Sequence, residues 1–105
     1  MAVSTISVNG LIPATQDIIY APPSNWYGTF TNIRIIAMQA CNVTLWKRLE
    51  TEDPVLLMSC CYEEGDWSDD DTRYELKEKE VLMAETDGNP DVTFVMNGEE
   101  REVLL

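Results

Sequence analysis

The sequence predicts an all-β protein folded as an antiparallel β-sandwich of about eight short strands, in a jelly-roll or immunoglobulin-like arrangement. Short stretches rich in Val, Ile, Thr, Tyr and Phe recur about every ten residues, and a turn signal follows each of them. No stretch has the apolar spacing of a helix of about ten residues. The chain has 105 residues, 45% of them hydrophobic, so we expect a single domain over residues 1–105.

The N-terminal strands are defined by alternation and by the residues that interrupt it. Residues 5–8 alternate between apolar and polar side chains and stop at an Asn-Gly pair. Residues 11–15 contain a proline, which suits an edge segment because proline cannot donate a backbone hydrogen bond. Residues 17–20 form a further short strand that ends before two prolines.

The longest β-rich stretch is residues 29–38. Side chains of a regular strand point alternately to its two faces. Strict alternation therefore places Ile33 and Ile35 on one face, with Phe30 and Ile36 on the other.

The middle of the chain supplies two more strands and an acidic segment. Residues 43–48 alternate, which gives a strand with one largely apolar and one mixed face. Residues 55–62 are apolar enough to predict a central strand. The acidic residues 63–71 are then expected to form a loop, in which Gly65 allows a tight turn.

The C-terminal part alternates short strands with turns. We expect a short strand at residues 74–76, a turn at 77–79 and a strand at 80–86. Residues 87–91 carry a strong loop signal. Residues 92–96 form the last core strand, which is expected to end at an Asn-Gly pair.

The residue chemistry argues against catalysis. The chain contains no histidine, the usual general base and a common metal ligand. Its three cysteines, Cys41, Cys60 and Cys61, have no C-x-x-C spacing, so we expect neither a zinc site nor a disulfide framework. At least one of the adjacent cysteines should pack in the core. We therefore expect no enzyme, no catalytic residues, no cofactor and no metal.

Charge is distributed unevenly along the chain. The net charge is −12, made up of +2 over residues 1–49 and −14 over residues 50–105. Such a surface repels phosphates, so nucleic acid and anionic membranes are not expected partners. We expect a docking face drawn largely from residues 1–49. The acidic segment 63–71 is expected to be a solvated loop, with cation binding as the alternative.

Neither a signal peptide nor a membrane span is expected. Residues 1–12 lack a basic region, and the apolar runs are too short to cross a bilayer. Aromatic and basic side chains in polar surroundings are candidates for a partner interface, because they bury much area or carry complementary charge. The candidate interface residues are Trp26, Tyr27, Arg34, Trp46, Lys47, Arg48 and Trp67.

A pattern of turn residues and strands runs through nearly the whole chain. It comprises V-N-G-L-I-P-A-T at 8–15, I-Y-A-P-P at 19–23, V-T-L-W at 43–46, E-E-G-D at 63–66 and V-T-F-V-M-N-G at 92–98. This pattern resembles a group of virion structural proteins of tailed bacteriophages, each of roughly a hundred residues. Lys79 stands where that group tends to have a glycine, so we expect a different turn geometry there.

The resemblance implies a β-sandwich that attaches to a virus particle. It implies a decoration (cement) protein that is made in the host cytoplasm, resides in the virion and docks on the major capsid protein or a neck protein. It also implies a homo-oligomer, such as a trimer. A neck, tail or fibre-associated component is the alternative within the same group.

Two other functions remain open on the residues alone. An acidic protein can mimic DNA and occupy the positive groove of a nuclease or repressor, which the charge of residues 50–105 favours. A β-sandwich can also bind carbohydrate, with Trp26, Tyr27 and Trp46 as a stacking platform.

Overall fold

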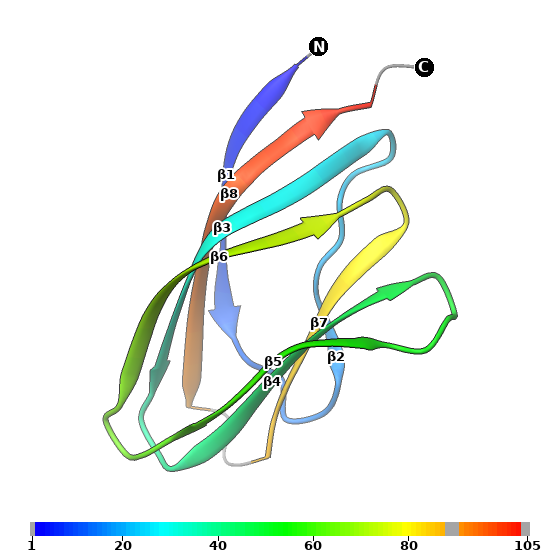
Figure 1. Cartoon of the computed structure of the whole chain (residues 1–105). Helices are drawn as coiled ribbons and strands as arrows, with labels where there is room; N and C mark the ends of the chain where they lie inside the picture. Colours follow the sequence, from blue (N-terminus) through cyan, green and yellow to red (C-terminus); the bar gives the residue numbers. More distant parts are fainter. Residues whose placement is uncertain (1, 88–90, 104–105) are drawn as a thin grey trace.

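A computed structural model describes residues 2–87 and 91–103, and its regular secondary structure is entirely β. The strands are β1 (Val3–Leu11), β2 (Asp17–Tyr20), β3 (Trp26–Ala37), β4 (Cys41–Leu49), β5 (Val55–Tyr62), β6 (Trp67–Leu76), β7 (Glu80–Thr86) and β8 (Val92–Glu102). They form two four-stranded antiparallel sheets that pack face to face (Figure 1). The predicted all-β sandwich is confirmed. Of the predicted loop at 87–91, residues 88–90 lie outside the described part.

The strand order is that of a jelly roll. The first sheet has the order β1-β8-β3-β6 and the second sheet the order β2-β7-β4-β5. Apart from the β4–β5 hairpin, each pair of consecutive strands is divided between the two sheets. This crossing between sheets distinguishes the jelly roll, built from two Greek keys, from the immunoglobulin-like alternative. Within the described part of the chain, no helix is long and apolar enough to cross a membrane.

The core lies between the two sheets and consists of the side chains that each sheet turns inward. Its most deeply buried members are Ile12, Phe30, Ile33, Ile35, Val43, Leu45, Leu76, Leu82, Val92 and Met96. Burying one such large apolar side chain contributes about 1.5–3 kcal/mol to stability. The Tyr20 and Phe30 rings meet edge to face, with centroids 4.8 Å apart. The core is therefore continuous across the sandwich.

Two tyrosine hydroxyls join the two sheets. Tyr20 on β2 donates a hydrogen bond of 2.6 Å to the Glu100 carboxylate on β8. The Tyr62 hydroxyl on β5 lies 2.7 Å from the Ser68 hydroxyl on β6. Burial raises the pKa of both phenols, that of Tyr62 to about 12, so both remain protonated and neutral at physiological pH.

The predicted face of Phe30 is wrong because β3 is not regular. The register of β3 against β8 and β6 shifts between Phe30 and Asn32, which marks a β-bulge. An extra residue at a bulge reverses the alternation beyond it. Phe30 consequently shares the buried face with Ile33 and Ile35, while Ile36 lies on the face opposite those two isoleucines, as predicted, and this face points outward.

The first and last strands are longer than predicted. β1 runs through its Asn-Gly pair to Leu11, and β8 runs through its own to Glu102. The two strands pair antiparallel from Val3 opposite Arg101 to Leu11 opposite Thr93. Backbone hydrogen bonding along this ladder outweighs the local turn preference of Asn-Gly. The predicted edge segment at 11–15 is therefore wrong beyond Leu11.

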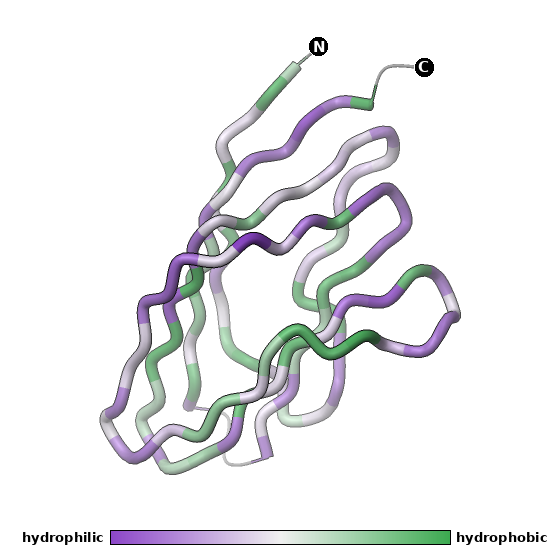
Figure 2. The backbone as a smooth tube through the Cα atoms, viewed as in Figure 1, coloured by the Kyte–Doolittle hydropathy of each residue, from purple (hydrophilic) through white to green (hydrophobic). Residues whose placement is uncertain are grey.

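The predicted positions of the acidic segment and of residues 55–62 also need correction. Only residues 63–66 form a turn, and the remaining acids belong to β6, an edge of the first sheet. Residues 55–62 form β5, which is an edge strand rather than a central one. Cys60 and Cys61 are both exposed, whereas Cys41 is buried. One side of an edge strand faces water instead of a neighbouring strand, so acidic side chains are tolerated on β6. Figure 2 shows that β6 is largely hydrophilic, whereas the start of β5 is hydrophobic.

Candidate functional site

The outer face of the first sheet carries three adjoining features. Cross-strand partners on this face stand side by side in rows across β1, β8, β3 and β6. One end of the face holds an exposed apolar row, the middle a polar network, and the other end a hollow. Each is described in turn.

The apolar row consists of Leu11, Ile36 and Trp67. Leu11 stands opposite Thr93, Thr93 opposite Ile36, and Ile36 opposite Trp67, so the row crosses all four strands. The three apolar side chains are 60%, 39% and 65% exposed, respectively. Ile36 and Trp67 also line a shallow depression of about 390 Å³ together with Arg34 and Asp69. The row therefore presents apolar surface that no part of the described chain covers.

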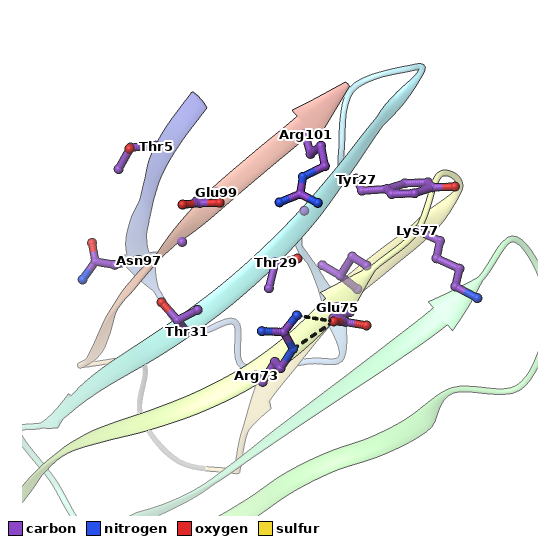
Figure 3. Close-up of a pocket in the computed structure, with 13 residues that line it drawn as sticks. Thr5, Tyr27, Thr29, Thr31, Arg73, Glu75, Lys77, Asn97, Glu99 and Arg101 are labelled. Atoms are coloured by element: carbon purple, nitrogen blue, oxygen red, sulfur yellow. Dashed lines mark hydrogen bonds and ion pairs between the residues drawn. The ribbon is translucent and has the colours of Figure 1, made fainter. Parts of the chain in front are cut away.

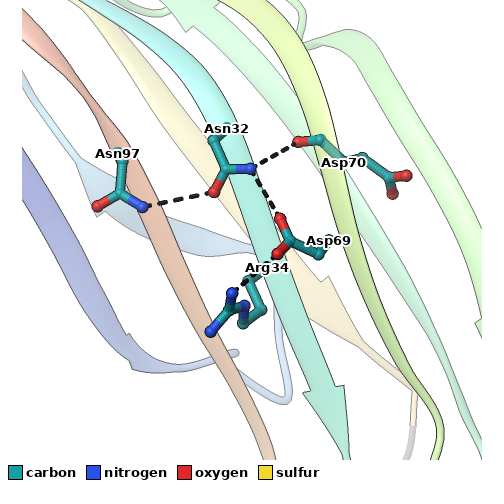
Figure 4. A network of polar contacts seen from close by, with 5 residues as sticks. All are labelled: Asn32, Arg34, Asp69, Asp70 and Asn97. Atoms are coloured by element: carbon teal, nitrogen blue, oxygen red, sulfur yellow. Dashed lines mark hydrogen bonds and ion pairs between the residues drawn. The ribbon is translucent and has the colours of Figure 1, made fainter.

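A polar network borders the apolar row (Figure 4). The guanidinium of Arg34 pairs with the Asp69 carboxylate at 2.8 Å. The amide of Asn32 donates to the other Asp69 oxygen at 2.7 Å and to the backbone carbonyl of Asp70 at 3.4 Å. The amide of Asn97 in turn donates to the Asn32 side-chain oxygen at 3.4 Å. The network links β8, β3 and β6 and fixes the Arg34 side chain beside the row.

The network also determines the ionisation of Asp69. The hydrogen bond from the Asn32 amide and the contact with the Arg34 guanidinium lower the pKa of the Asp69 carboxyl. Asp69 therefore stays ionised down to lower pH than an isolated aspartate. Its charge compensates that of Arg34, so this border of the row is polar but close to neutral.

The opposite end of the face contains a hollow of about 600 Å³, which we call the Tyr27 hollow (Figure 3). Thr5, Glu99, Thr29 and Glu75 stand opposite one another across its floor, so hydroxyl and carboxylate groups alternate from β1 to β6. Tyr27 lies further along β3, with Arg101 as its cross-strand partner. Figure 3 shows these side chains projecting from the same side of the sheet.

Both signs of charge line the Tyr27 hollow. Its bases are Arg73, Lys77 and Arg101, and its acids are Glu75 and Glu99. Arg73 pairs with Glu75 at 2.8 Å. The lining therefore offers donors and acceptors together, although the whole chain carries a net charge of −12.

The β3 bulge shapes the floor of this hollow. A Cβ atom added at Gly98 would lie 2.0 Å from the Thr29 carbonyl oxygen, so β8 approaches the bulge too closely for any side chain. Bulges bend a strand and increase its twist. Thr31, which falls inside the bulge, lines the hollow together with Thr29. The concavity is thus built into the sheet backbone.

The structure brings together some of the predicted interface residues and separates others. Arg34 and Trp67 lie side by side at the apolar row. Tyr27 lies on the same face at the far end, and Trp26, its neighbour on β3, points to the opposite face. Trp46 belongs to the second sheet. The predicted stacking platform of Trp26, Tyr27 and Trp46 is therefore not formed.

Trp46 lies in a second apolar row on the outer face of the second sheet, which we call the covered row. It runs across the sheet through Ile18, Met83, Trp46 and Leu56. Trp46 is half-buried, and Met83 is almost completely buried. Of the two other predicted interface residues on β4, Lys47 lies 3.7 Å from the Glu80 carboxylate and Arg48 pairs in register with Val81.

Several residues of the site were not identified from the sequence. Alternation along β3 separates Ile36 from Ile33 and Ile35, but it does not show which of the two faces is the core. The sequence contains no local signal for Leu11, Asn32 or Asp69, because their role depends on which strands pair and in which register. Register is a long-range property that no local pattern reveals.

The acids and cysteines do not gather into a metal site within residues 2–87 and 91–103. No group of three or more Cys, Asp and Glu side chains there has the arrangement needed to hold an ion. The chain matches no protein-family model and no curated protein sequence.

Proposed function

We propose that this protein is a non-enzymatic structural protein of a tailed-bacteriophage virion. In this proposal it decorates the head shell, docks on the major capsid protein through the apolar row and associates with other copies of itself. The observation that carries the proposal is the exposure of Leu11, Ile36 and Trp67 on one end of a strongly acidic molecule.

The chemistry of the row suits a protein partner. Contiguous exposed apolar side chains with a polar border mark interaction surfaces. Tryptophan is enriched among the residues that contribute most to binding, because it buries a large area with little loss of rotamer freedom. The Arg34–Asp69 pair would form the rim and give orientation more than affinity.

The fold supports the proposal by analogy. The chain-wide pattern of strands and turns resembles small phage structural proteins, and that resemblance implies a β-sandwich. Jelly rolls occur in viral capsid proteins, although they also occur in lectins. Fold alone does not define function, so the apolar row carries more weight.

Self-association would use the edge strand β5. None of its eight residues is charged, and Val55 and Leu56 are exposed. Exposed edges without charge readily pair with another strand. Two copies that each carry a net charge of −12 repel one another, so an uncharged strand is the surface at which they can approach most closely. Many weak contacts on a shell then add up through avidity.

The composition of the particle tests the function directly. Particles produced by the genome that encodes this chain are purified and measured by mass spectrometry, and the chain is located by cryo-electron microscopy. We expect many copies on the outer surface of the head. Location at the neck, tail or fibres would favour the alternative virion role. Absence from the particles, together with binding to a nuclease that duplex DNA competes away, would favour the DNA mimic.

A pair of variants tests the docking face. Trp67→Ala should lower the occupancy of the chain on particles at least about tenfold, because an interface tryptophan contributes on the order of 2 kcal/mol. Tyr27→Ala removes an exposed aromatic ring from the other end of the same face and should leave occupancy unchanged. Equal occupancy of both variants on the particles would refute docking through the row.

A further inference from the structure

The Tyr27 hollow has no part in the docking function proposed above and does not depend on it. Its volume of about 600 Å³ lies within the range of small-ligand sites, and its groups stand on paired strands rather than on loops. The paired strands fix the backbone from which these side chains project, so the short threonine side chains are largely in place before binding.

The groups in the hollow fit a ligand that both donates and accepts hydrogen bonds. The floor alternates Thr5, Glu99, Thr29 and Glu75 across four strands. Threonine hydroxyls can donate or accept, carboxylates accept, and the nearby arginines donate. A ligand rich in hydroxyl groups satisfies this mixture, whereas an aliphatic ligand would leave the polar groups unpaired at a cost.

The charges argue for a neutral ligand. Three bases and two acids line the hollow, and Arg73 and Glu75 neutralise each other. An anion would meet Glu99 on the floor and the repulsion of a chain with net charge −12 on approach. A cation would meet Lys77 and Arg101 on the Tyr27 side. An anionic or a cationic ligand would therefore meet groups of its own charge, whereas a neutral polyhydroxylated molecule can bond with both the acids and the bases.

Tyr27 supplies the apolar contact that such a ligand also needs. Its ring is 41% exposed and lies beside the polar floor. The face of an aromatic ring is electron-rich, and the C–H groups on one side of a sugar ring are weakly positive. A sugar ring stacked on Tyr27 would therefore place its hydroxyl groups towards the strand residues.

We propose that the Tyr27 hollow binds a neutral saccharide. One sugar ring stacks on Tyr27, and its hydroxyl groups bond with Thr29, Glu99 and the other groups of the floor. Because the hollow is open to solvent and holds only part of a glycan, we expect weak affinity at a single site.

A glycan array identifies the ligand and tests the proposal. Labelled protein is applied to an array of neutral, sialylated and sulfated glycans, and the strongest neutral hit is then titrated by protein-observed NMR. We expect hits among the neutral glycans, with affinity unchanged when salt is raised from about 0.05 to about 0.5 M. Hits confined to anionic glycans and weakened by salt would overturn the neutral assignment, and an array without hits would overturn the site.

Variants separate this site from the docking face. Tyr27→Ala should weaken binding of the NMR ligand by at least about tenfold, and Thr29→Val, which keeps the side-chain shape, by about fivefold for one lost hydrogen bond. Trp67→Ala should bind the saccharide normally. Unchanged binding in Tyr27→Ala, with the melting temperature of the variant preserved, would refute the proposal. If the chain binds saccharide but is absent from purified particles, the saccharide proposal is supported and the virion function is refuted.

Discussion

The outer faces of the two sheets both carry an apolar row, but the central residues of the two rows differ in exposure. In the apolar row of the first sheet, the central residue Ile36 is 39% exposed. In the covered row of the second sheet, the central residue Met83 is 5% exposed, and Trp46 beside it is half-buried. The end residues of the covered row, Ile18 and Leu56, are 45% and 59% exposed, so only the centre of this row is covered. We infer that the centre of the covered row, Met83 and Trp46, stabilises the fold, whereas the apolar row is available to a partner along its whole length.

The largest effect is expected at the close approach that shapes the first sheet. In Gly98→Ala the new methyl group would lie 2.0 Å from the Thr29 carbonyl oxygen, so β8 and β3 must separate. Overpacking against backbone costs about 3 kcal/mol or more. Thermal unfolding should show a melting temperature lower by on the order of 10–20 °C.

Gly10→Ala is the matched control for Gly98→Ala. Its new methyl group would lie 3.7 Å from the Phe94 ring, an ordinary van der Waals contact. The melting temperature should change by only a few degrees, about 3 °C or less. A similar loss in both variants would mean that the bend of the first sheet does not depend on this contact.

The comparison of the rows is tested directly by truncating the two central residues. Met83→Ala should lower the free energy of unfolding by about 2–3 kcal/mol, because it removes a buried side chain. Ile36→Ala should lower it by about 1 kcal/mol or less, since much of that side chain already contacts water. Urea unfolding of both variants measures the difference. Equal losses would contradict the distinction between a stabilising row and an available one.

The link between the two sheets gives a smaller, pH-dependent effect. Tyr62→Phe removes the 2.7 Å contact with Ser68 and should cost about 1 kcal/mol near neutral pH. The pKa of Tyr62 is raised to about 12 in the fold, from about 10 in the unfolded chain. The stability that this shift provides is present below about pH 10 and is lost as the pH rises towards 12.

Melting temperatures between about pH 8 and about pH 11 measure that alkaline loss. The parent protein should lose more stability over this interval than Tyr62→Phe. Tyr20 is present in both proteins, and burial raises its pKa as well. It therefore accounts for alkaline loss of stability that remains in Tyr62→Phe. Parallel curves for the two proteins would show that the phenol of Tyr62 does not couple folding to pH.

The smallest effect concerns the turn between β6 of the first sheet and β7 of the second. Lys79 has a φ of 71°, a conformation that glycine adopts without strain. Lys79→Gly should therefore raise the free energy of unfolding by about 0.5 kcal/mol, since its exposed pair with Glu50 contributes little. Lys77→Gly, in the same turn, should be destabilising by comparison. A gain in both variants would mean that backbone strain at Lys79 is not the cause.

Local patterns predicted much of the fold. Most of the strands were located from alternation and turn residues, and the sandwich followed from their number and spacing. The errors have one physical source, which is pairing between distant strands. The Asn-Gly pairs failed to end β1 and β8 because those two strands bond to each other along the whole of β1. The acids of β6 looked like a loop because an edge strand does not need an apolar face.

The candidate site was less predictable than the fold. Trp67 and Arg34 were identified because a large ring or a base in polar surroundings stands out in any sequence. Their contact depends on Ile36 standing opposite Trp67 and Arg34 opposite Asp69 across the β3–β6 ladder. At Lys79, where a different turn geometry was expected, the backbone has a φ of 71°, a conformation that glycine adopts without strain. Alternation could not reveal the bulge that moved Phe30 into the core.

Antiparallel pairing of β1 with β8 sets the polarity of the molecule. Val3 and Arg101 are cross-strand partners at one end of the sandwich (Figure 1), and Leu11 and Trp67 lie at the other. Eight residues along a strand separate the two ends by about 27 Å. The apolar row and the end of the sheet at which β1 begins can therefore contact two different molecules at once without steric overlap.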